Sequence, residues 1–349
     1  MSNLIDHIIH KDESVRAALT KLNNLAADAI LFVVDEDRKL MGSLTDGDLR
    51  RGFINNLNFE DPLLSYIQTN PVFITKGHYD LDQLETYKEK NFKIIPILDN
   101  DHCIVDIINF RIQKTIIPAN AVLMAGGKGK RLMPLTANTP KPLLKVGDKP
   151  IIEYNIDRLI SYGIKNIHLS INYLGEQLIE YFGDGSSKNA NIKYVKESKP
   201  LGTVGSVLLI DEHEYDDILI MNSDLLTNID FADFFATYKK ANADMAVAAT
   251  SYYVDVPYAV LETDTENNVR SLKEKPRYTY YSNAGIYLLK KSLLEKIPPG
   301  DFFDITDLMD IVLTENKKLV TYPITGYWLD IGKPEDFQKA QEDIKHIKL

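Results

Sequence analysis

The chain has 349 residues, 44% of them hydrophobic, which is enough for two domains with separate cores. Its 50 acidic and 40 basic side chains give a net charge of -10, which argues against a nucleic acid or an anionic membrane as the main partner. Cys103 is the single cysteine, so an intramolecular disulfide and a thiolate metal cluster are both excluded.

The hydrophobic residues are not gathered into an export or membrane segment. The N-terminus lacks a basic start followed by a long apolar core, and no run of about 18 apolar residues occurs along the chain. We therefore expect a soluble, cytoplasmic protein.

Residues 1–115 contain an approximate repeat. Each copy has a helix-like segment, an apolar strand, an acidic turn and a second strand; the helices are predicted at 13–24 and 81–91, and the strands at 29–35, 39–45, 93–99 and 103–109. One copy fills about half of this region, which is too long for a solenoid unit and fits a pseudo-twofold pair. The repeat resembles a tandem CBS module. The resemblance implies a small α/β domain that senses a nucleotide or joins two copies of the chain through its helices.

The first copy contains the segment GSLTDGD at 42–48, which matches the G-x-x-T-x-x-D pattern of CBS domains. In that family the Thr and Asp hold a nucleotide ribose, so the resemblance implies an adenine nucleotide at Thr45 and Asp48. A carboxylate can accept hydrogen bonds from both ribose hydroxyls. A helix N-cap at Thr45 or Asp46 with no ligand explains the same letters. The second copy, at 105–111, lacks the Gly, Thr and Asp, so only one intact site is expected.

Beyond Pro118, strands alternate with helices, which predicts crossover connections and a mainly parallel sheet. The strands are expected at 121–125, 166–172, 191–195, 218–222 and 244–250. A helix should follow Pro150 and stop at Gly163, and others are expected at 175–182, 230–241, 305–315 and 334–346.

A glycine-rich loop follows the first of these strands. Gly126, Gly127 and Gly129 let backbone N–H groups approach an anion without obstruction by a Cβ atom. Four cations close by can neutralise that anion: Lys128, Lys130, Arg131 and Lys141. The combination indicates a nucleoside triphosphate, and an ordinary strand-to-helix turn with surface lysines is the alternative.

Two other phosphate-binding loops are excluded by their residue requirements. A Walker loop needs Gly five positions before Gly129 and Ser or Thr at position 131, where the chain has Met124 and Arg131. A dinucleotide fingerprint needs a small residue where Leu132 stands.

Residues 126–143 resemble the signature of the sugar-1-phosphate nucleotidyltransferases, G-G-x-G-T-R-L-x-P-L-T followed by P-K-P-L, with Lys130 in place of the usual Thr. The resemblance extends over 119–349 and implies a Rossmann-like, GT-A-like α/β catalytic domain. It also implies that the three glycines and Lys130 bind the nucleotide, and that Arg131 and Lys141 meet its triphosphate.

Two carboxylates complete the resemblance. The strand 218–222 leads to Asp224, at the edge of an open α/β sheet where ligands bind, and resembles the family's N-x-D, whose Asp binds magnesium. Residues 327–335 match W-x-D-I-G-T-P-E and supply Asp330. Two carboxylates from distant strands can hold one Mg²⁺ that keeps its other positions for phosphate oxygens and water. A helix cap at Asp224 and a turn before Gly332 are the alternatives.

Three further segments resemble substrate-binding motifs. Gly202 and Thr203 lie in a segment like L-G-T-A-G, which meets the nucleobase in the family, although a helix start with Thr203 as N-cap explains the same letters. Glu274 and Lys275 belong to an E-K-P element that holds the sugar and its phosphate, or form a solvated charge pair.

The third segment, N-A-G-I-Y, contains Asn283 and Gly285, which border the sugar in the family; a buried strand is the alternative. The family's Y-G-V-V appears at 258–261 with Ala259 in place of Gly, which leaves the identity of the sugar open.

These resemblances together imply a reaction between a nucleoside triphosphate and a sugar 1-phosphate, with Mg²⁺ as cofactor and pyrophosphate as the second product. A CBS module before such a domain resembles the sugar-1-phosphate guanylyltransferases of bacterial legionaminic acid synthesis, which favours GTP and a hexose or hexosamine 1-phosphate. A uridylyl-, thymidylyl- or cytidylyltransferase of the same family is the alternative, as is an adenine-nucleotide sensor with a degenerate catalytic domain. We expect a homo-oligomer formed through the CBS module.

Overall fold

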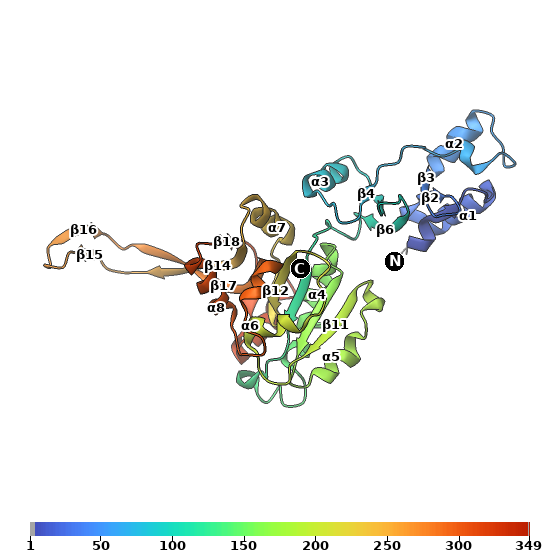
Figure 1. The fold of residues 1–349 in the computed structure, drawn as a ribbon. Coiled ribbons are helices and arrows are strands. Elements are labelled where there is room, and N and C mark those ends of the chain that lie inside the picture. The colour runs from blue at the N-terminus through green and yellow to red at the C-terminus, as the bar shows by residue number, and fades with distance from the viewer. Residues whose placement is uncertain (1–3, 348) are drawn as a thin grey trace. The chain divides into compact units, whose positions relative to one another are not determined.

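The structure is a computed structural model that describes residues 4–347 and residue 349 (Figure 1). The chain divides into two compact units, Met1–Ile117 and Pro118–Leu349, here called unit 1 and unit 2. Among the described residues, no helix has the length and apolar character needed to cross a membrane.

Unit 1 contains two small sheets with the same topology. They are formed by β1 (Ile8–His10), β2 (Leu31–Val34) and β3 (Leu40–Leu44), and by β4 (Ile74–Thr75), β5 (Ile94–Leu98) and β6 (Ile104–Asn109). In each sheet the first two strands are parallel and the last two antiparallel, and a helix joins the parallel pair: α1 (Val15–Leu25) or α3 (Leu81–Glu89). The repeat that the sequence predicts is therefore present in the fold.

The two copies differ after their third strand. The first continues into α2 (Asp46–Ile54), whereas among the described residues no helix follows β6 before unit 1 ends. The copies are joined by backbone hydrogen bonds from Leu40 N–H to the His102 carbonyl, 3.1 Å, and from Ile104 N–H to the Arg38 carbonyl, 3.2 Å. This pairing makes the two sheets one continuous module.

Unit 2 is built on a seven-stranded sheet with the order β11-β10-β7-β12-β17-β14-β18. The strands are β7 (Asn120–Met124), β10 (Asn166–Ile171), β11 (Asn191–Lys196), β12 (Asp217–Asn222), β14 (Met245–Asp255), β17 (Arg277–Lys290) and β18 (Leu319–Pro323). Strand β17 runs antiparallel to both of its neighbours, and every other adjacent pair is parallel. The sheet is mainly parallel, as the alternation of strands and helices predicts.

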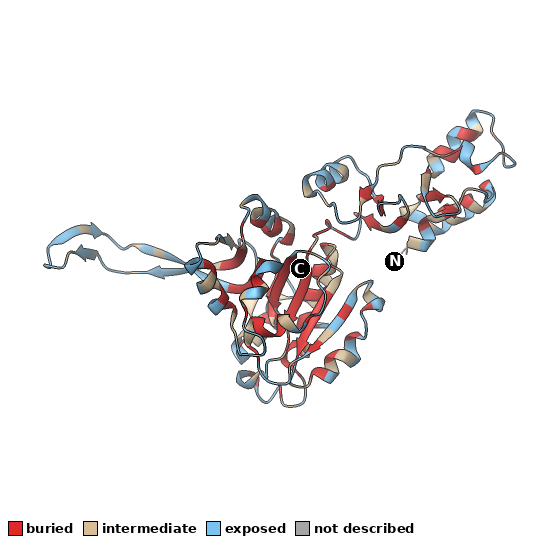
Figure 2. Cartoon of the chain, viewed as in Figure 1, coloured by how far each residue is buried: buried red, intermediate tan, exposed pale blue. Residues whose placement is uncertain are grey.

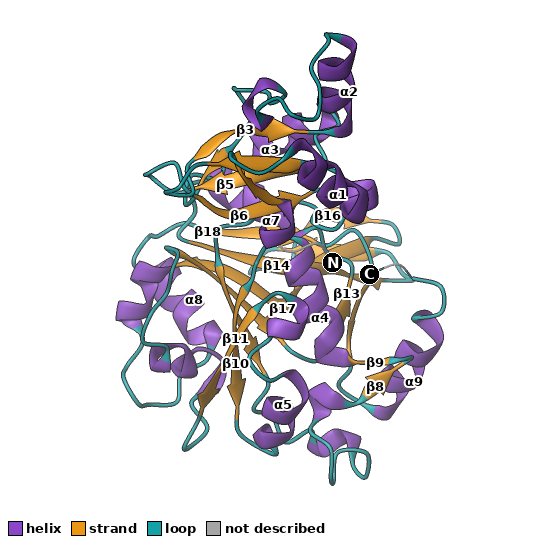
Figure 3. Ribbon diagram, turned by 90° about the vertical axis from the view of Figure 1, so that its right-hand side faces the viewer, coloured by secondary structure: helices purple, strands orange, loops and turns teal. Residues whose placement is uncertain are grey.

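Helices cover both faces of this sheet (Figure 3). They are α4 (Ile151–Ser161), α5 (Gly175–Phe182), α6 (Gly202–Gly205), α7 (Phe231–Lys240) and α8 (Ile305–Thr314). Helix α9 (Pro334–Asp343) packs instead with residues outside this sheet, among them Val146 and Leu329. Five successive residues of β12 are buried, Asp217 to Met221, which requires cover on both sides because successive side chains point to opposite faces. On one face, Leu308 and Val312 of α8 pack into the same core as Ile220.

Three two-stranded sheets stand apart from the main sheet. They pair β8 (Lys145–Val146) with β9 (Lys149–Pro150), β13 (Leu225–Thr227) with β19 (Trp328–Asp330), and β15 (Val260–Thr263) with β16 (Val269–Lys273). The pair of β13 and β19 matters most for the site below, because its strands come from distant parts of the chain.

Strands β14 and β17 continue beyond the sheet as a two-stranded ribbon, residues 250–282, which ends in β15 and β16 (Figure 1). All residues from 250 to 283 are described, and none of them is buried (Figure 2). The strand predicted at 244–250 is thus only the buried first part of β14, which continues to Asp255.

Candidate active site

The glycine-rich loop lies at the carboxyl end of β7, between that strand and the 3-10 helix η4 (Lys130–Leu132). Gly129 has a φ of 59°, and an added Cβ would lie 2.9 Å from Cγ2 of Thr136, so the position requires glycine. An added Cβ at Gly127 would meet no atom within 4 Å. The loop is therefore fixed at Gly129 and open at Gly127, where an anion can approach the backbone.

Asp224 and Asp330 come from distant parts of the sequence and lie side by side in the fold. Asp224 immediately precedes β13, and Asp330 is the last residue of β19. Asp330 is paired with Leu225 in the antiparallel register, and the N–H of Ile331 donates to the carbonyl of Asp224 at 3.1 Å. The pairing of β13 with β19 therefore brings both carboxylates to the carboxyl end of β12.

Two cations accompany these carboxylates. The Lys141 ammonium forms an ion pair with Oδ2 of Asp224, and the two side chains are only 11% and 23% exposed. The Arg131 guanidinium packs against the backbone of Gly332, where Nη2 would lie 3.4 Å from an added Cβ. All four residues predicted to be catalytic are thus gathered at one edge of the sheet.

The charges within this cluster act on one another. Burial and the neighbouring Asp224 carboxylate raise the pKa of Asp330 above its ordinary value, whereas Lys141 and Arg131 oppose the shift. A divalent cation between the two aspartates would offset both the burial and the mutual repulsion of their charges. Carboxylate oxygens are also the protein ligands that Mg²⁺ prefers. The donor set therefore fits a hard divalent ion.

Asn283 and Gly285 lie beside the end of β12. Gly285 has a φ of 72°, and an added Cβ would lie 2.6 Å from Nδ2 of Asn222. The Gly285 N–H donates to Oδ1 of Asn283 at 2.9 Å, and the Trp328 indole N–H donates to the carbonyl of Ala284 at 2.9 Å. This segment is thereby tied to the strand that carries Asp330.

Gly202 and Thr203 begin the short helix α6, for which Leu201 is the N-cap residue. The N–H and hydroxyl of Thr203 both donate to Oδ1 of Asp304, at 3.0 and 3.1 Å. The alternative interpretation, in which Thr203 is the helix N-cap, is therefore wrong. Its contact to a nucleobase stays a prediction.

Glu197 is a residue of this region that the sequence analysis missed. Its Oε1 accepts a hydrogen bond from the Ser170 hydroxyl at 2.6 Å, and its Oε2 accepts one from the Leu201 N–H at 3.1 Å. An added Cβ at Gly126 would lie 3.3 Å from Oε1. Glu197 therefore joins the glycine-rich loop to the start of α6. Its position directly after β11, at the carboxyl edge of the sheet, is the signal that would have found it.

Glu274 and Lys275 are not brought to this cluster. Both are exposed, and they lie where the ribbon passes from β16 to β17. A strand advances about 3.3 Å per residue, so Lys275 lies on the order of 25 Å along the ribbon from Asn283. Tyr258 and Ala259 lie in the same ribbon and are also exposed. Glu274 and Lys275 therefore lie far along the ribbon from Asp224 of the same chain.

In unit 1, Thr45 is the N-cap of α2 and forms a capping box with Asp48. The buried Asp48 carboxylate accepts hydrogen bonds from the N–H and hydroxyl of Thr45, at 2.8 and 2.6 Å, and from Gln68 at 2.9 Å, and it pairs with Arg51. These partners lower the pKa of Asp48, against the effect of its burial. The geometry is that of the helix N-cap alternative, and a nucleotide role for the two residues stays a prediction.

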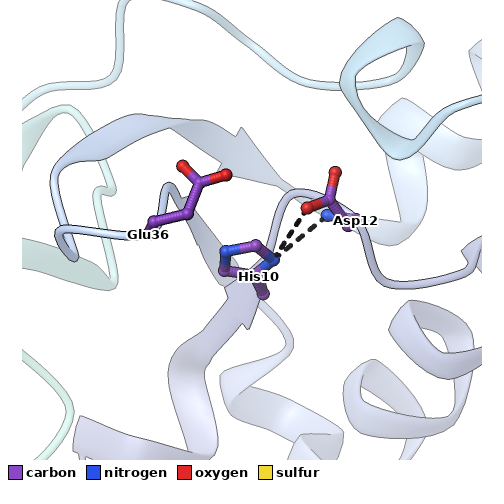
Figure 4. Close-up of side chains that lie close together, drawn as sticks. All are labelled: His10, Asp12 and Glu36. Atoms are coloured by element: carbon purple, nitrogen blue, oxygen red, sulfur yellow. Dashed lines mark hydrogen bonds and ion pairs between the residues drawn. The ribbon is translucent and has the colours of Figure 1, made fainter.

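Unit 1 also gathers His10, Asp12 and Glu36 near its surface (Figure 4). Nδ1 of His10 lies 3.4 Å from the Asp12 carboxylate and accepts from the Asp12 N–H, and Lys11 already pairs with Glu36 at 2.9 Å. Because Asp12 and Glu36 are exposed and Glu36 is neutralised, the group is explained as a surface ion-pair cluster.

A separate polar cavity of about 460 Å³ lies at the opposite edge of the sheet, where β7, β10 and β11 begin. It is lined by His168 and His213. Nδ1 of His168 and both ring nitrogens of His213 are buried without a hydrogen-bond partner. Burial, the His213 ring and Lys193 lower the pKa of His168 to about 4, and burial also lowers the pKa of His213.

This histidine pair predicts that unit 2 loses stability in mild acid. The unfolded chain binds a proton at His168 near pH 6.5, whereas the folded chain resists protonation until about pH 4, so the stabilisation present above pH 6.5 is lost as the pH falls toward 4. His168 alone should lower the free energy of unfolding by about 2 kcal/mol between pH 7 and pH 5. Urea unfolding can be followed by fluorescence of Trp328, the single tryptophan.

Replacement of His168 by asparagine should reduce this pH dependence. The same replacement at His346, which is exposed, serves as the matched control and should leave it unchanged. Equal pH dependence in wild type and His168→Asn would contradict the interpretation.

Comparison with known proteins bears on both units. The nucleotidyl transferase family matches residues 120–347, and the CBS domain matches residues 4–55. The chain is 31% identical over 226 residues to a mannose-1-phosphate guanyltransferase of Schizosaccharomyces pombe, covering 62% of each protein. It is 30% identical over 230 residues to a mannose-1-phosphate guanylyltransferase of Mycobacterium tuberculosis, covering 64% of each. The chain thus spans about three fifths of the length of these curated relatives.

A solved structure has a similar fold. HddC from Yersinia pseudotuberculosis is 27% identical, with a TM-score of 0.51, and the match covers 65% of this chain and 99% of HddC. A crystal structure of HddC complexed with GMP-PN matches with a TM-score of 0.50. Because the matched segment 120–347 contains the glycine-rich loop and both aspartates, the resemblance seen in the sequence is confirmed: the chain belongs to the nucleotidyl transferase family.

Proposed function

We propose that this protein is a sugar-1-phosphate nucleotidyltransferase, which joins a nucleoside triphosphate to a sugar 1-phosphate and releases pyrophosphate. The observation that carries the proposal is the meeting of Asp224 and Asp330 with Lys141 and Arg131. The cluster lies at the same sheet edge as the open glycine-rich loop, as ligand sites in α/β folds do.

The reaction needs charge neutralisation rather than a base. A phosphate monoester has a second pKa of about 6, so the attacking oxygen of the sugar 1-phosphate is already deprotonated at neutral pH. That oxygen forms a bond to the α-phosphorus of the triphosphate, and the bond to the β-phosphate oxygen breaks, so pyrophosphate leaves with the electron pair. Arg131 and Lys141 would neutralise the triphosphate and orient it for in-line attack.

Mg²⁺ is the metal we propose for the two aspartates. Bound there, it would supply Lewis-acid polarisation and charge neutralisation of phosphate oxygens. Asp224 and Asp330 would hold it, and Lys141 would keep the Asp224 carboxylate oriented through their ion pair. Removal of divalent ions by a chelator should therefore stop turnover.

GTP is the nucleotide we favour, with a hexose or hexosamine 1-phosphate as acceptor. The support is that the two relatives above are named as guanylyltransferases and that HddC was solved with GMP-PN. Gly202, Thr203 and the loop at Gly126 would border the nucleobase, and Asn283 and Gly285 would border the sugar. We further propose that residues 1–115 act as a regulatory or dimerisation module ahead of the catalytic domain.

A pyrophosphate-release screen tests this proposal. The purified chain is given GTP, UTP, dTTP or CTP, each crossed with glucose, mannose, glucosamine and N-acetylglucosamine 1-phosphates in the presence of Mg²⁺. Release is expected only when both substrates are present, and most strongly with GTP. Activity with UTP, dTTP or CTP instead would keep the reaction class and overturn the nucleotide. No release from any pair would overturn the function.

A further inference from the structure

The cavity at the opposite edge of the main sheet is lined by polar side chains. Its lining residues are three asparagines, two histidines, two lysines and three acidic residues. Its volume of about 460 Å³ is in the range of small-molecule sites. Asn120 lines the cavity and begins β7, and the glycine-rich loop follows the other end of that strand, on the order of 20 Å away. The cavity is therefore separate from the active site.

Polar side chains interrupt an otherwise apolar face of the sheet at this cavity. His168 is paired with Val122 on one side and with Lys193 on the other, both in parallel register, so these three side chains share one face. Val122 packs with Ile220 in the hydrophobic core beneath α8. The row of side chains therefore leaves the core at His168, where an apolar residue is the usual choice.

The two histidine rings lack hydrogen bonds at buried nitrogens. His168 is 7% exposed, and its Nδ1 is buried without a partner, as are both ring nitrogens of His213. The ring centroids are 6.4 Å apart. Burial of a polar atom without a hydrogen bond is unfavourable. Because no hydrogen bond at these atoms fixes the rings, each ring can turn about χ2 and present a nitrogen to the cavity.

An ammonium group lies near each ring. Burial, the His213 ring and Lys193 lower the pKa of His168, and burial and Lys291 lower the pKa of His213. Both lysines are exposed, and among the described residues neither takes part in an ion pair. These positive charges favour an anion and repel a metal ion. Among the described side chains, no third His, Cys, Asp or Glu lies close enough to complete a metal site with the two rings.

The carboxylates of the cavity suit another part of the same ligand. Glu214 is held in place, since its N–H donates to Oδ1 of Asn120 at 3.1 Å and its carboxylate accepts from Asn166. Asp211 and Glu212 line the cavity and are exposed. Carboxylate oxygens accept hydrogen bonds from hydroxyl groups. The lining therefore fits a molecule that carries an anionic group at one end and hydroxyl groups at the other.

We propose that this cavity binds a phosphorylated, hydroxyl-bearing small molecule, such as a sugar phosphate, with its phosphate against Lys193, Lys291 and the two histidine rings. A phosphate monoester carries nearly two negative charges at neutral pH and has three strong acceptor oxygens, which match the ammonium and ring N–H donors. Hydroxyl groups of the same molecule would donate to Asp211 and Glu212. Because the cavity shares no residue with the catalytic cluster, this binding is independent of the proposed function.

Isothermal titration calorimetry on the full-length protein tests the site. Glucose 6-phosphate is the probe, inorganic phosphate presents the anion alone, and glucose presents the hydroxyl groups alone. Lys193→Ala and Lys291→Ala should each weaken binding of glucose 6-phosphate by about tenfold, because one charge-assisted contact to the phosphate is lost. Lys240→Ala, at an exposed position of α7, is the matched control and should bind as wild type does.

The histidines should make this binding depend on pH. A bound phosphate favours the protonated rings, so each proton taken up should strengthen binding by up to about tenfold per pH unit as the pH falls from about 8 to 7. With a second pKa of about 6, the phosphate stays mostly dianionic in this range. His168→Asn should reduce the dependence. The other charged groups of the cavity are of residue types that titrate outside this range. They are Lys193, Lys291, Asp211, Glu212 and Glu214.

The same titrations define the results that would overturn this assignment of the cavity. Wild-type affinity in both lysine variants would do so, as would binding that Arg131→Ala removes and Lys193→Ala leaves intact, since the ligand would then lie in the active site. Equal affinity for inorganic phosphate and glucose 6-phosphate would exclude the hydroxyl contacts. Absence of saturable binding by either phosphate compound, together with binding of Zn²⁺ that His168→Asn abolishes, would identify a metal site instead.

Discussion

Replacement of Asp224 by alanine is expected to lower kcat by about 10³-fold or more, because charge stabilisation by a metal is worth several kcal/mol of the barrier. The change removes one of two adjacent carboxylates and leaves the mostly buried Lys141 without its ion pair. Steady-state pyrophosphate release at saturating substrates measures the effect. Asp224→Asn keeps the size of the side chain and removes its charge, so a similar loss is expected.

Asp310→Ala is the matched control for this experiment. Asp310 is exposed on α8, and its substitution should leave kcat unchanged. Near-wild-type turnover in Asp224→Ala, under conditions where that control behaves as wild type, would refute the assignment of Asp224 to the metal.

Replacement of Arg131 by alanine should lower kcat/KM for the nucleotide by about 10²- to 10³-fold, the usual cost of removing one donor that stabilises charge developing in the transition state. The guanidinium lies against Gly332, beside Asp330, so it is held at the site where the phosphates would meet the carboxylates. Arg131→Lys should recover part of the loss, because an ammonium keeps the charge and lacks the planar fork. Initial rates over a range of GTP concentrations give the comparison.

Lys130→Ala provides the internal comparison in the same 3-10 helix. Both side chains are exposed, but it is the Arg131 guanidinium that lies against Gly332 beside Asp330, so loss of Lys130 should raise KM by less than about tenfold. If the two alanine variants lose the same activity, the loop acts through its summed charge and Arg131 has no special position.

The catalytic cluster could be predicted from the sequence because Asp224 follows a buried strand and Arg131 follows the glycine-rich loop, while Lys141 and Asp330 belong to motifs that resemble the family signature. The runs that lead to Asp224 and the loop are continuous and apolar, and the observed strands β12 and β7 start and end within one or two residues of the predicted bounds. The sequence alone does not predict that β13 pairs with β19. That contact joins residues about a hundred positions apart, and strand partners at such separation leave no local pattern.

Two other features were missed for physical reasons. The ribbon carries neither a buried apolar run nor an apolar–polar alternation facing a core, so only the buried part of β14 has a periodic signal. Glu197 was missed because its role depends on Ser170 and Leu201, which meet it only in the folded chain. By contrast, the helix N-cap at Thr45 is a local pattern, so the sequence predicts it as an alternative, and the structure adds the capping box with Asp48.

Strand β17 runs without interruption from Arg277 to Lys290, from the solvated ribbon through Asn283 and Gly285 into the middle of the sheet. A pleated strand is stiff along its length, so a tilt of its free end also moves the backbone at Gly285, which lies against Asn222. The strand is therefore a rigid connection: a molecule that binds the exposed end of the ribbon would also move the backbone at Asn283 and Gly285, where we propose that the sugar lies.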